Sequence, residues 1–116
     1  MVSGIGVDIV RVERFSKYTL DSSFCMKIFT QGEREYLIKK PAESLAGLFA
    51  AKEAVSKAIG TGIRGFSFTD IEIYHDEYGK PLVRLHGRAR ELAGESVIHI
   101  SISHTAQDAV AFAVIS

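Results

Sequence analysis

The sequence predicts a single α+β domain over residues 1–116, with helices mainly in the first half packed on a small, mainly antiparallel sheet. Three observations support this prediction. Residues 42–59 are rich in the helix formers Ala, Leu, Glu and Lys. Apolar and polar side chains alternate along residues 97–103, as they do in a strand with one buried face. A turn-rich segment at residues 75–81 separates two short β-type segments, which is typical of a hairpin.

The first residues predict a strand followed by a helix. Residues 2–9 are mostly apolar and form the expected strand, loosened by Gly4 and Gly6. A helix is expected over residues 10–18. On it three basic residues recur in steps of three and share one solvent face: Arg11, Arg14 and Lys17.

Two helix boundaries are marked by capping signals. Thr30 and Glu33 have the spacing of a capping box, so a short helix is expected over residues 32–39. Gly60 follows the long helix, where a left-handed glycine commonly ends a helix.

The second half of the chain is predicted to be mainly strand. Residues 66–74 and 82–85 form the expected hairpin, and a short helix is expected over residues 87–92. Strands are expected over residues 97–103 and 109–115, the latter as a continuous apolar run.

The composition excludes several classes of protein. Lys and Arg total 14, as do Asp and Glu, so the basic excess typical of a general nucleic-acid binder is absent. The single cysteine, Cys25, cannot form an intrachain disulfide, which fits a reducing compartment. No apolar run has the length of a membrane span, and the first residues lack the pattern of a signal peptide. We therefore expect a cytoplasmic protein.

Asp8 ends a strand of buried type, and two interpretations of it stay open. The carboxylate could cap the helix expected after it. It could also bind Mg²⁺, which prefers hard oxygen ligands.

The long helix carries a second polar group. Phe49, Glu53 and Lys57 are spaced four residues apart and stack along one face, where Glu53 and Lys57 could simply form a surface ion pair. Lys52 lies on the apolar stripe, so we expect a buried stem with an ammonium group that is paired or reaches solvent.

Two further segments have polar groups that core packing does not require. The glycines of residues 60–65 would let a backbone approach phosphate, although the loop follows a helix and could simply end it. Ser103 and His104 close a strand, where a histidine can act as an acid, a base or a phosphate ligand, or can be an ordinary hydrogen-bonded loop residue.

The order of these segments resembles the bacterial holo-acyl-carrier-protein synthases, small members of the 4′-phosphopantetheinyl transferase superfamily. The resemblance covers essentially the whole chain, from residue 4 to residue 115. Its segments are Gly-Ile-Gly-Val-Asp, then Leu-Ala-Gly-Leu-Phe-Ala-Ala-Lys-Glu-Ala-Val-Ser-Lys-Ala, Gly-Thr-Gly, Phe-Thr-Asp-Ile-Glu-Ile, Gly-Lys-Pro and Ile-Ser-Ile-Ser-His-Thr.

The resemblance implies a function and a set of site residues. It implies transfer of 4′-phosphopantetheine from coenzyme A to a serine of an apo-acyl carrier protein, with Mg²⁺ as the metal. Asp8 and Glu53 match the metal-binding acids, and Lys57 matches a residue that neutralises or protonates the leaving group. Glu53, Lys57 and His104 are the expected catalytic residues, and the base is either Glu53 or a metal-bound water. The expected coenzyme A contacts are Lys57, Gly60, Thr61, Gly62, Ser103 and His104.

The resemblance also implies partners and an assembly. The family is typically a trimer with active sites at the subunit interfaces. Its acyl carrier proteins are acidic, so the basic residues Arg11, Arg14 and Lys17 are expected to dock them.

One departure from the family concerns the 3′-phosphate of coenzyme A. Leu48 stands where the family often carries an arginine, and Arg64, Lys39 or Lys40 could compensate.

Two other classes of function compete: a carrier-protein-binding module without activity, and a structural or assembly protein. Replacing Glu53 with Ala would abolish activity in an enzyme but not binding in a pure binder.

Overall fold

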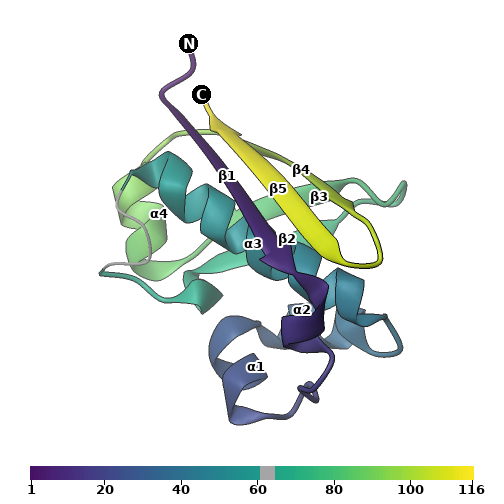
Figure 1. The fold of residues 1–116 in the computed structure, drawn as a ribbon. Coiled ribbons are helices and arrows are strands. Elements are labelled where there is room, and N and C mark those ends of the chain that lie inside the picture. The colour runs from purple at the N-terminus through teal and green to yellow at the C-terminus, as the bar shows by residue number, and fades with distance from the viewer. Residues whose placement is uncertain (61–64) are drawn as a thin grey trace.

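A three-stranded antiparallel sheet lies across the long central helix in the computed structural model, which describes residues 1–60 and 65–116. The strands are β1 (Gly4–Arg11), β4 (Ile98–His104) and β5 (Asp108–Ile115), in the order β1-β5-β4. The central helix is α3 (Ala42–Ile59), and Figure 1 shows it behind this sheet. Because β5 is the middle strand, β1 and β4 form its two opposite edges.

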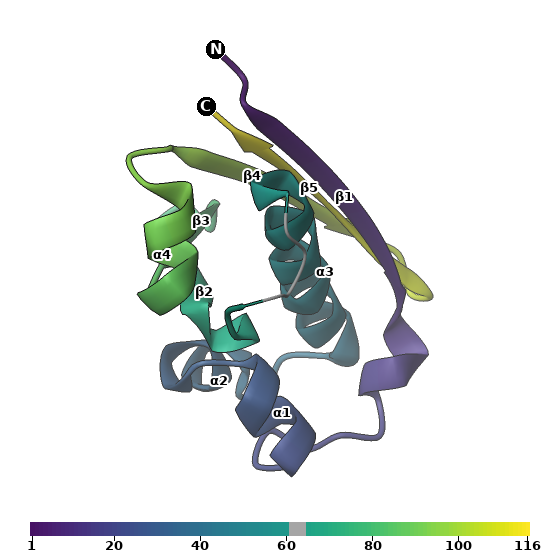
Figure 2. The same cartoon turned by 90° about the vertical axis from the view of Figure 1, so that its left-hand side faces the viewer.

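A second layer covers the other side of α3. It contains the two-stranded antiparallel sheet of β2 (Ile71–His75) and β3 (Pro81–Leu85), followed by α4 (Gly87–Ala93). Figure 2 shows these elements on one side of α3 and the β1-β5-β4 sheet on the other. The central helix is therefore enclosed by two layers, which explains why most of its residues are buried.

Short helical segments close one end of the molecule. They are η1 (Val12–Phe15), α1 (Ser23–Ile28) and α2 (Gln31–Leu37), with η2 (Phe68–Asp70) just before β2. The Phe15 ring packs against Phe49 of α3, with ring centroids 5.3 Å apart. This contact fixes the chain that leaves β1 against the middle of the central helix.

Two glycines let β1 lie directly on the backbone of α3. A Cβ atom on Gly4 would lie 2.1 Å from the carbonyl oxygen of Ala58, and one on Gly6 would lie 2.0 Å from that of Ala54. Both distances are too short for any side chain, so only glycine allows the approach. Asp8 has the same parity in the strand, so its side chain also points toward α3.

Several sequence predictions are confirmed, including the α+β class and the hairpin. The helix over residues 42–59 has the predicted bounds, and Gly60 ends it with φ +101°. The Thr30 hydroxyl accepts a hydrogen bond from the Glu33 amide, and the Glu33 carboxylate accepts one from the Thr30 amide, which completes the predicted capping box.

Other predictions are wrong. The helix expected over residues 10–18 is instead the end of β1 followed by the single 3₁₀ turn η1, because β5 continues to pair with β1 as far as Arg11. The strand expected over residues 66–74 begins only at Ile71, because Phe68–Asp70 form the 3₁₀ turn η2 and the partner strand β3 ends at Leu85, opposite Ile71. Helix α1, which Ser22 caps by accepting a hydrogen bond from the Cys25 amide, was not predicted.

In the part of the chain that the structure describes, no helix is long and apolar enough to span a membrane. The thiol of Cys25 is buried and unbonded to another cysteine.

Candidate functional site

The structure brings together Asp8, Glu53 and Lys57, which we call the β1 half-site. The ammonium group of Lys57 donates to Asp8 Oδ1 at 3.2 Å and to the carbonyl oxygen of Val7 at 3.0 Å. Glu53 lies one helical turn before Lys57 on α3. Asp8 of β1 therefore lies beside the two residues of α3, because the glycines of β1 allow the strand to approach the helix closely.

Two earlier interpretations of these residues are wrong. Asp8 does not cap a helix, because η1 begins after Arg11 and has no side-chain cap. Lys57 pairs with Asp8, and no ion pair joins it to Glu53 among the described residues.

The β1 half-site places negative charges close together. Burial raises the pKa of Glu53 most, and the negative charge of Asp8 raises it further, while Lys57 and Arg14 lower it. Arg14 belongs to this environment, with its guanidinium carbon 5.3 Å from the centre of the Phe49 ring. A cation beside the two carboxylates would relieve their repulsion.

The donor set of the β1 half-site suits Mg²⁺. This ion is commonly held by one or two carboxylates, with substrate phosphates and water completing its shell. Asp8 and Glu53 supply two such carboxylates. Over residues 1–60 and 65–116, no group of three or more His, Cys, Asp or Glu side chains is placed to hold a metal. An ion bound here would therefore draw its other ligands from the substrate and solvent.

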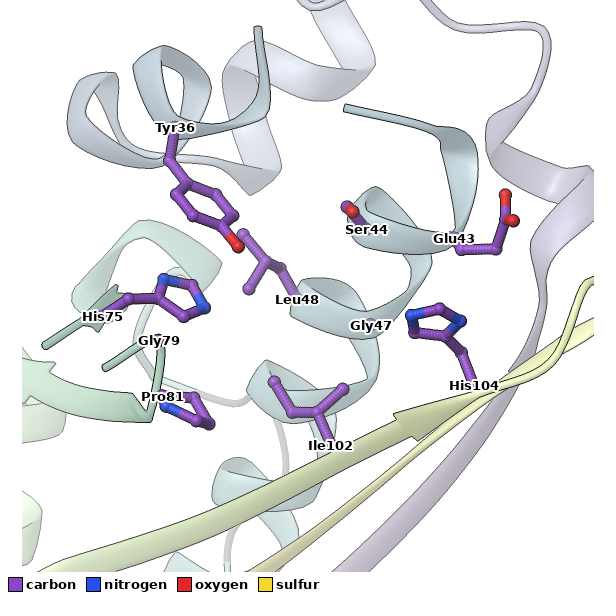
Figure 3. A pocket seen from close by; sticks show the side chains of 10 residues that line it. All are labelled: Tyr36, Glu43, Ser44, Gly47, Leu48, His75, Gly79, Pro81, Ile102 and His104. Atoms are coloured by element: carbon purple, nitrogen blue, oxygen red, sulfur yellow. The ribbon is translucent and has the colours of Figure 1, made fainter. Parts of the chain in front are cut away.

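A separate cavity of about 200 Å³ lies between α3, the β2–β3 hairpin, α2 and the end of β4. We call it the His104 cavity (Figure 3). Leu48, Ile102 and Pro81 give it apolar walls. Its polar groups are the side chains of Tyr36, Glu43, Ser44, His75 and His104.

Within one chain the His104 cavity and the β1 half-site are separate. Asp8 lies on β1 and His104 on β4, at opposite edges of the three-stranded sheet. The strand order could not be inferred from the sequence.

Ser103 is exposed and does not line the cavity, since its parity in β4 is opposite to that of Ile102. Gly60 ends α3, whereas Thr61, Gly62 and Arg64 lie outside the described residues.

A buried ion pair supports the central helix beside Glu53. Lys52 and Glu33 are both fully buried, and Lys52 Nζ lies 2.6 Å from Glu33 Oε1. Glu33 Oε2 also accepts from the Ile73 amide at 2.7 Å, and the pair thereby joins α2, α3 and β2. Burial lowers the pKa of Lys52, and Glu33 opposes that shift. The predicted buried stem of Lys52 is confirmed, whereas its partner Glu33 was not predicted.

The chain is similar to known proteins over nearly its whole length. The family model of the 4′-phosphopantetheinyl transferase superfamily matches residues 4–114. The chain belongs to this superfamily.

Individual relatives are similar over nearly their whole length. A holo-[acyl-carrier-protein] synthase of Clostridium novyi is 50% identical over 121 residues, covering 99% of this chain and 88% of the relative. Among solved structures, a holo-(acyl-carrier-protein) synthase of Bacillus anthracis in complex with CoA (3′,5′-ADP) has a TM-score of 0.84 and 42% identity, covering 99% of this chain and 96% of that one. The Helicobacter pylori enzyme in complex with coenzyme A has a TM-score of 0.83 and 35% identity, covering 97% and 99%.

Proposed function

We propose that the protein transfers the 4′-phosphopantetheine arm of coenzyme A to a serine of an apo-acyl carrier protein, with Mg²⁺. The serine Oγ forms a bond to the phosphorus that carries pantetheine, and the bond from that phosphorus to the bridging pyrophosphate oxygen breaks. The products are the holo-carrier protein and adenosine 3′,5′-bisphosphate. The observation that carries the proposal is the β1 half-site, in a chain whose relatives are holo-acyl-carrier-protein synthases.

Each residue of the β1 half-site has its own role in the proposed reaction. Asp8 and Glu53 would hold Mg²⁺, which neutralises charge on the pyrophosphate oxygens. Lys57 is half-exposed beside Asp8, so its ammonium group can reach the leaving phosphate and stabilise the charge that develops there. The serine proton would pass to Glu53 or to a water molecule bound at the half-site.

We further propose that the active protein is a homotrimer whose sites lie between chains. The outer face of the three-stranded sheet carries exposed apolar side chains, including Ile5, Val7, Ile9, Val110 and Phe112. Apolar faces of this kind are usually covered by a partner. The two functional regions lie at opposite sheet edges, so a head-to-tail ring would place the His104 cavity of one chain beside the β1 half-site of the next.

Mixing two inactive variants tests this arrangement. Lys57→Met removes a residue of the β1 half-site, and His104→Ala removes one from the cavity. Chains of the two variants are unfolded together and refolded at equal concentration. In a random ring about a quarter of the sites would combine an intact half-site with an intact cavity, so about a quarter of the wild-type rate should return.

The control is each variant refolded alone, which should stay inactive. No recovery in the mixture, from two variants that each assemble normally, would show that a single chain supplies the whole site.

We propose that the acidic carrier protein docks on the exposed side chains of Arg11, Arg14 and Lys17, close to the β1 half-site. The charge reversal Lys17→Glu should raise the KM for carrier protein and leave the KM for coenzyme A unchanged. An unchanged KM for the carrier would exclude Lys17 from docking. We expect this reaction to take place in the cytoplasm.

A further inference from the structure

We propose that His75, oriented by the ring of Tyr36, recognises the 3′-phosphate of coenzyme A in the His104 cavity. This inference rests on the proposed function and adds a specificity-determining residue to it. His75 is the last residue of β2, in the strand pair where it lies opposite Pro81.

The Tyr36 ring holds the imidazole of His75 in one plane. The ring centroids are 4.1 Å apart and the rings are inclined by only 11°, so the two side chains stack face to face. Both residues line the cavity, and Figure 3 shows the imidazole beside the tyrosine ring with its edge exposed to the cavity. A stacked histidine loses rotational freedom before any ligand arrives, which lowers the entropic cost of binding.

The ring nitrogens of His75 are available to a ligand. No hydrogen bond joins them to another side chain or backbone group within residues 1–60 and 65–116. The cavity wall therefore contains an oriented, partly exposed donor that a ligand can engage in place of solvent. Phosphate oxygens are strong acceptors and suit such a donor.

The surroundings of His75 favour an anion at its edge. Lys40 lies over the Tyr36 ring, with its ammonium nitrogen 4.9 Å from the ring centre, and His104 and the Ser44 hydroxyl supply further donors in the cavity wall. Glu43, which lines the cavity, and Asp76, whose negative charge acts on His75, oppose an anion there. Leu48 offers the ligand no hydrogen bond, so a phosphate here would depend on the imidazoles and the serine.

The ligand class follows from the shape of the substrate. Coenzyme A carries its pyrophosphate between the pantetheine arm and an adenosine with a 3′-phosphate. If the pyrophosphate lies at the β1 half-site, the adenosine end must lie beyond it. The His104 cavity combines apolar walls for the nucleoside with donors for a phosphate monoester.

The first test compares transfer from coenzyme A and from 3′-dephospho-coenzyme A. In His75→Gln, the KM for coenzyme A should rise about tenfold, because one hydrogen bond to a charged group is lost. The KM for 3′-dephospho-coenzyme A and both kcat values should stay within twofold of wild type, a factor of about 2 being the scatter expected for an uninvolved residue.

Three further variants separate orientation from contact. Tyr36→Phe keeps the stacked ring and should retain the preference for the 3′-phosphate, whereas Tyr36→Leu should lose much of it. The matched control is His86→Gln, since His86 is paired with Glu72 and does not line the cavity. It should keep the wild-type preference.

A binding measurement separates this inference from the proposed reaction. Calorimetry with adenosine 3′,5′-bisphosphate and adenosine 5′-monophosphate needs no transfer step. Wild type should prefer the bisphosphate, and His75→Gln should lose that preference. Failure of transfer with this pattern intact would refute the proposed reaction alone. An unchanged preference in His75→Gln, or equal affinity of wild type for both nucleotides, would overturn the role of His75.

Discussion

Replacing Gly6 with alanine tests how closely β1 must approach α3. A Cβ atom there would lie 2.0 Å from the carbonyl oxygen of Ala54 and 2.9 Å from the amide nitrogen of Ala58. Carbon–oxygen contacts under 3.0 Å are essentially absent from proteins, so strand and helix must separate by at least about 1 Å. Both atoms belong to the helix backbone, which cannot yield as a side chain can.

The expected cost of Gly6→Ala is about 3 kcal/mol in the free energy of unfolding, at the upper end of the usual range for overpacking. The separation also moves Asp8 away from Glu53 and Lys57, and a displacement of about 1 Å at a reacting centre can lower the rate about 100-fold. Urea unfolding at fixed protein concentration measures the first effect. Initial rates, taken where the variant is folded, measure the second.

Gly47→Ala is a suitable control for the stability effect of Gly6→Ala. Its Cβ would lie 3.0 Å from a methyl group of Ile102, a side chain that can move. Alanine also favours the helix by about 1 kcal/mol, so stability should change by no more than about 1 kcal/mol. Wild-type stability and activity in Gly6→Ala would refute the reasoning.

Three further predictions concern stability. Lys52→Met should cost about 3–5 kcal/mol in urea unfolding, since it leaves the buried Glu33 carboxylate unpaired; a loss below about 1 kcal/mol would contradict a buried ion pair. Thr30→Val should cost about 1 kcal/mol by removing the cap of α2, and circular dichroism during thermal unfolding should show a lower Tm than wild type. Burial and Lys40 lower the pKa of His75 from 6.5, so the unfolded chain binds more protons just below that pH. Wild type should therefore lose stability relative to His75→Gln as the pH falls through this window. A difference in the free energy of unfolding that does not change with pH would contradict the lowered pKa of His75.

The sequence predicted the parts of the fold that depend on local signals. The composition of residues 42–59 and the glycine after them define α3, and the spacing of Thr30 and Glu33 defines the capping box. Each signal lies within one element, so no knowledge of the tertiary structure is needed.

Features that depend on contacts distant in the sequence escaped prediction. Gly4 and Gly6 were expected only to loosen a strand, because their close contact with α3 exists only after packing. The pairing of Lys52 with Glu33 joins two helices and could not be inferred from either. The separation of Asp8 from His104 depends on the strand order β1-β5-β4.

The most direct test of the proposed function is a mass spectrum of apo-acyl carrier protein after incubation with this protein, coenzyme A and Mg²⁺. We predict a mass gain of one phosphopantetheine group, absent when EDTA is added and absent with Lys57→Met. No gain, with folded protein and a carrier that another transferase can modify, would contradict the proposed transfer to that carrier.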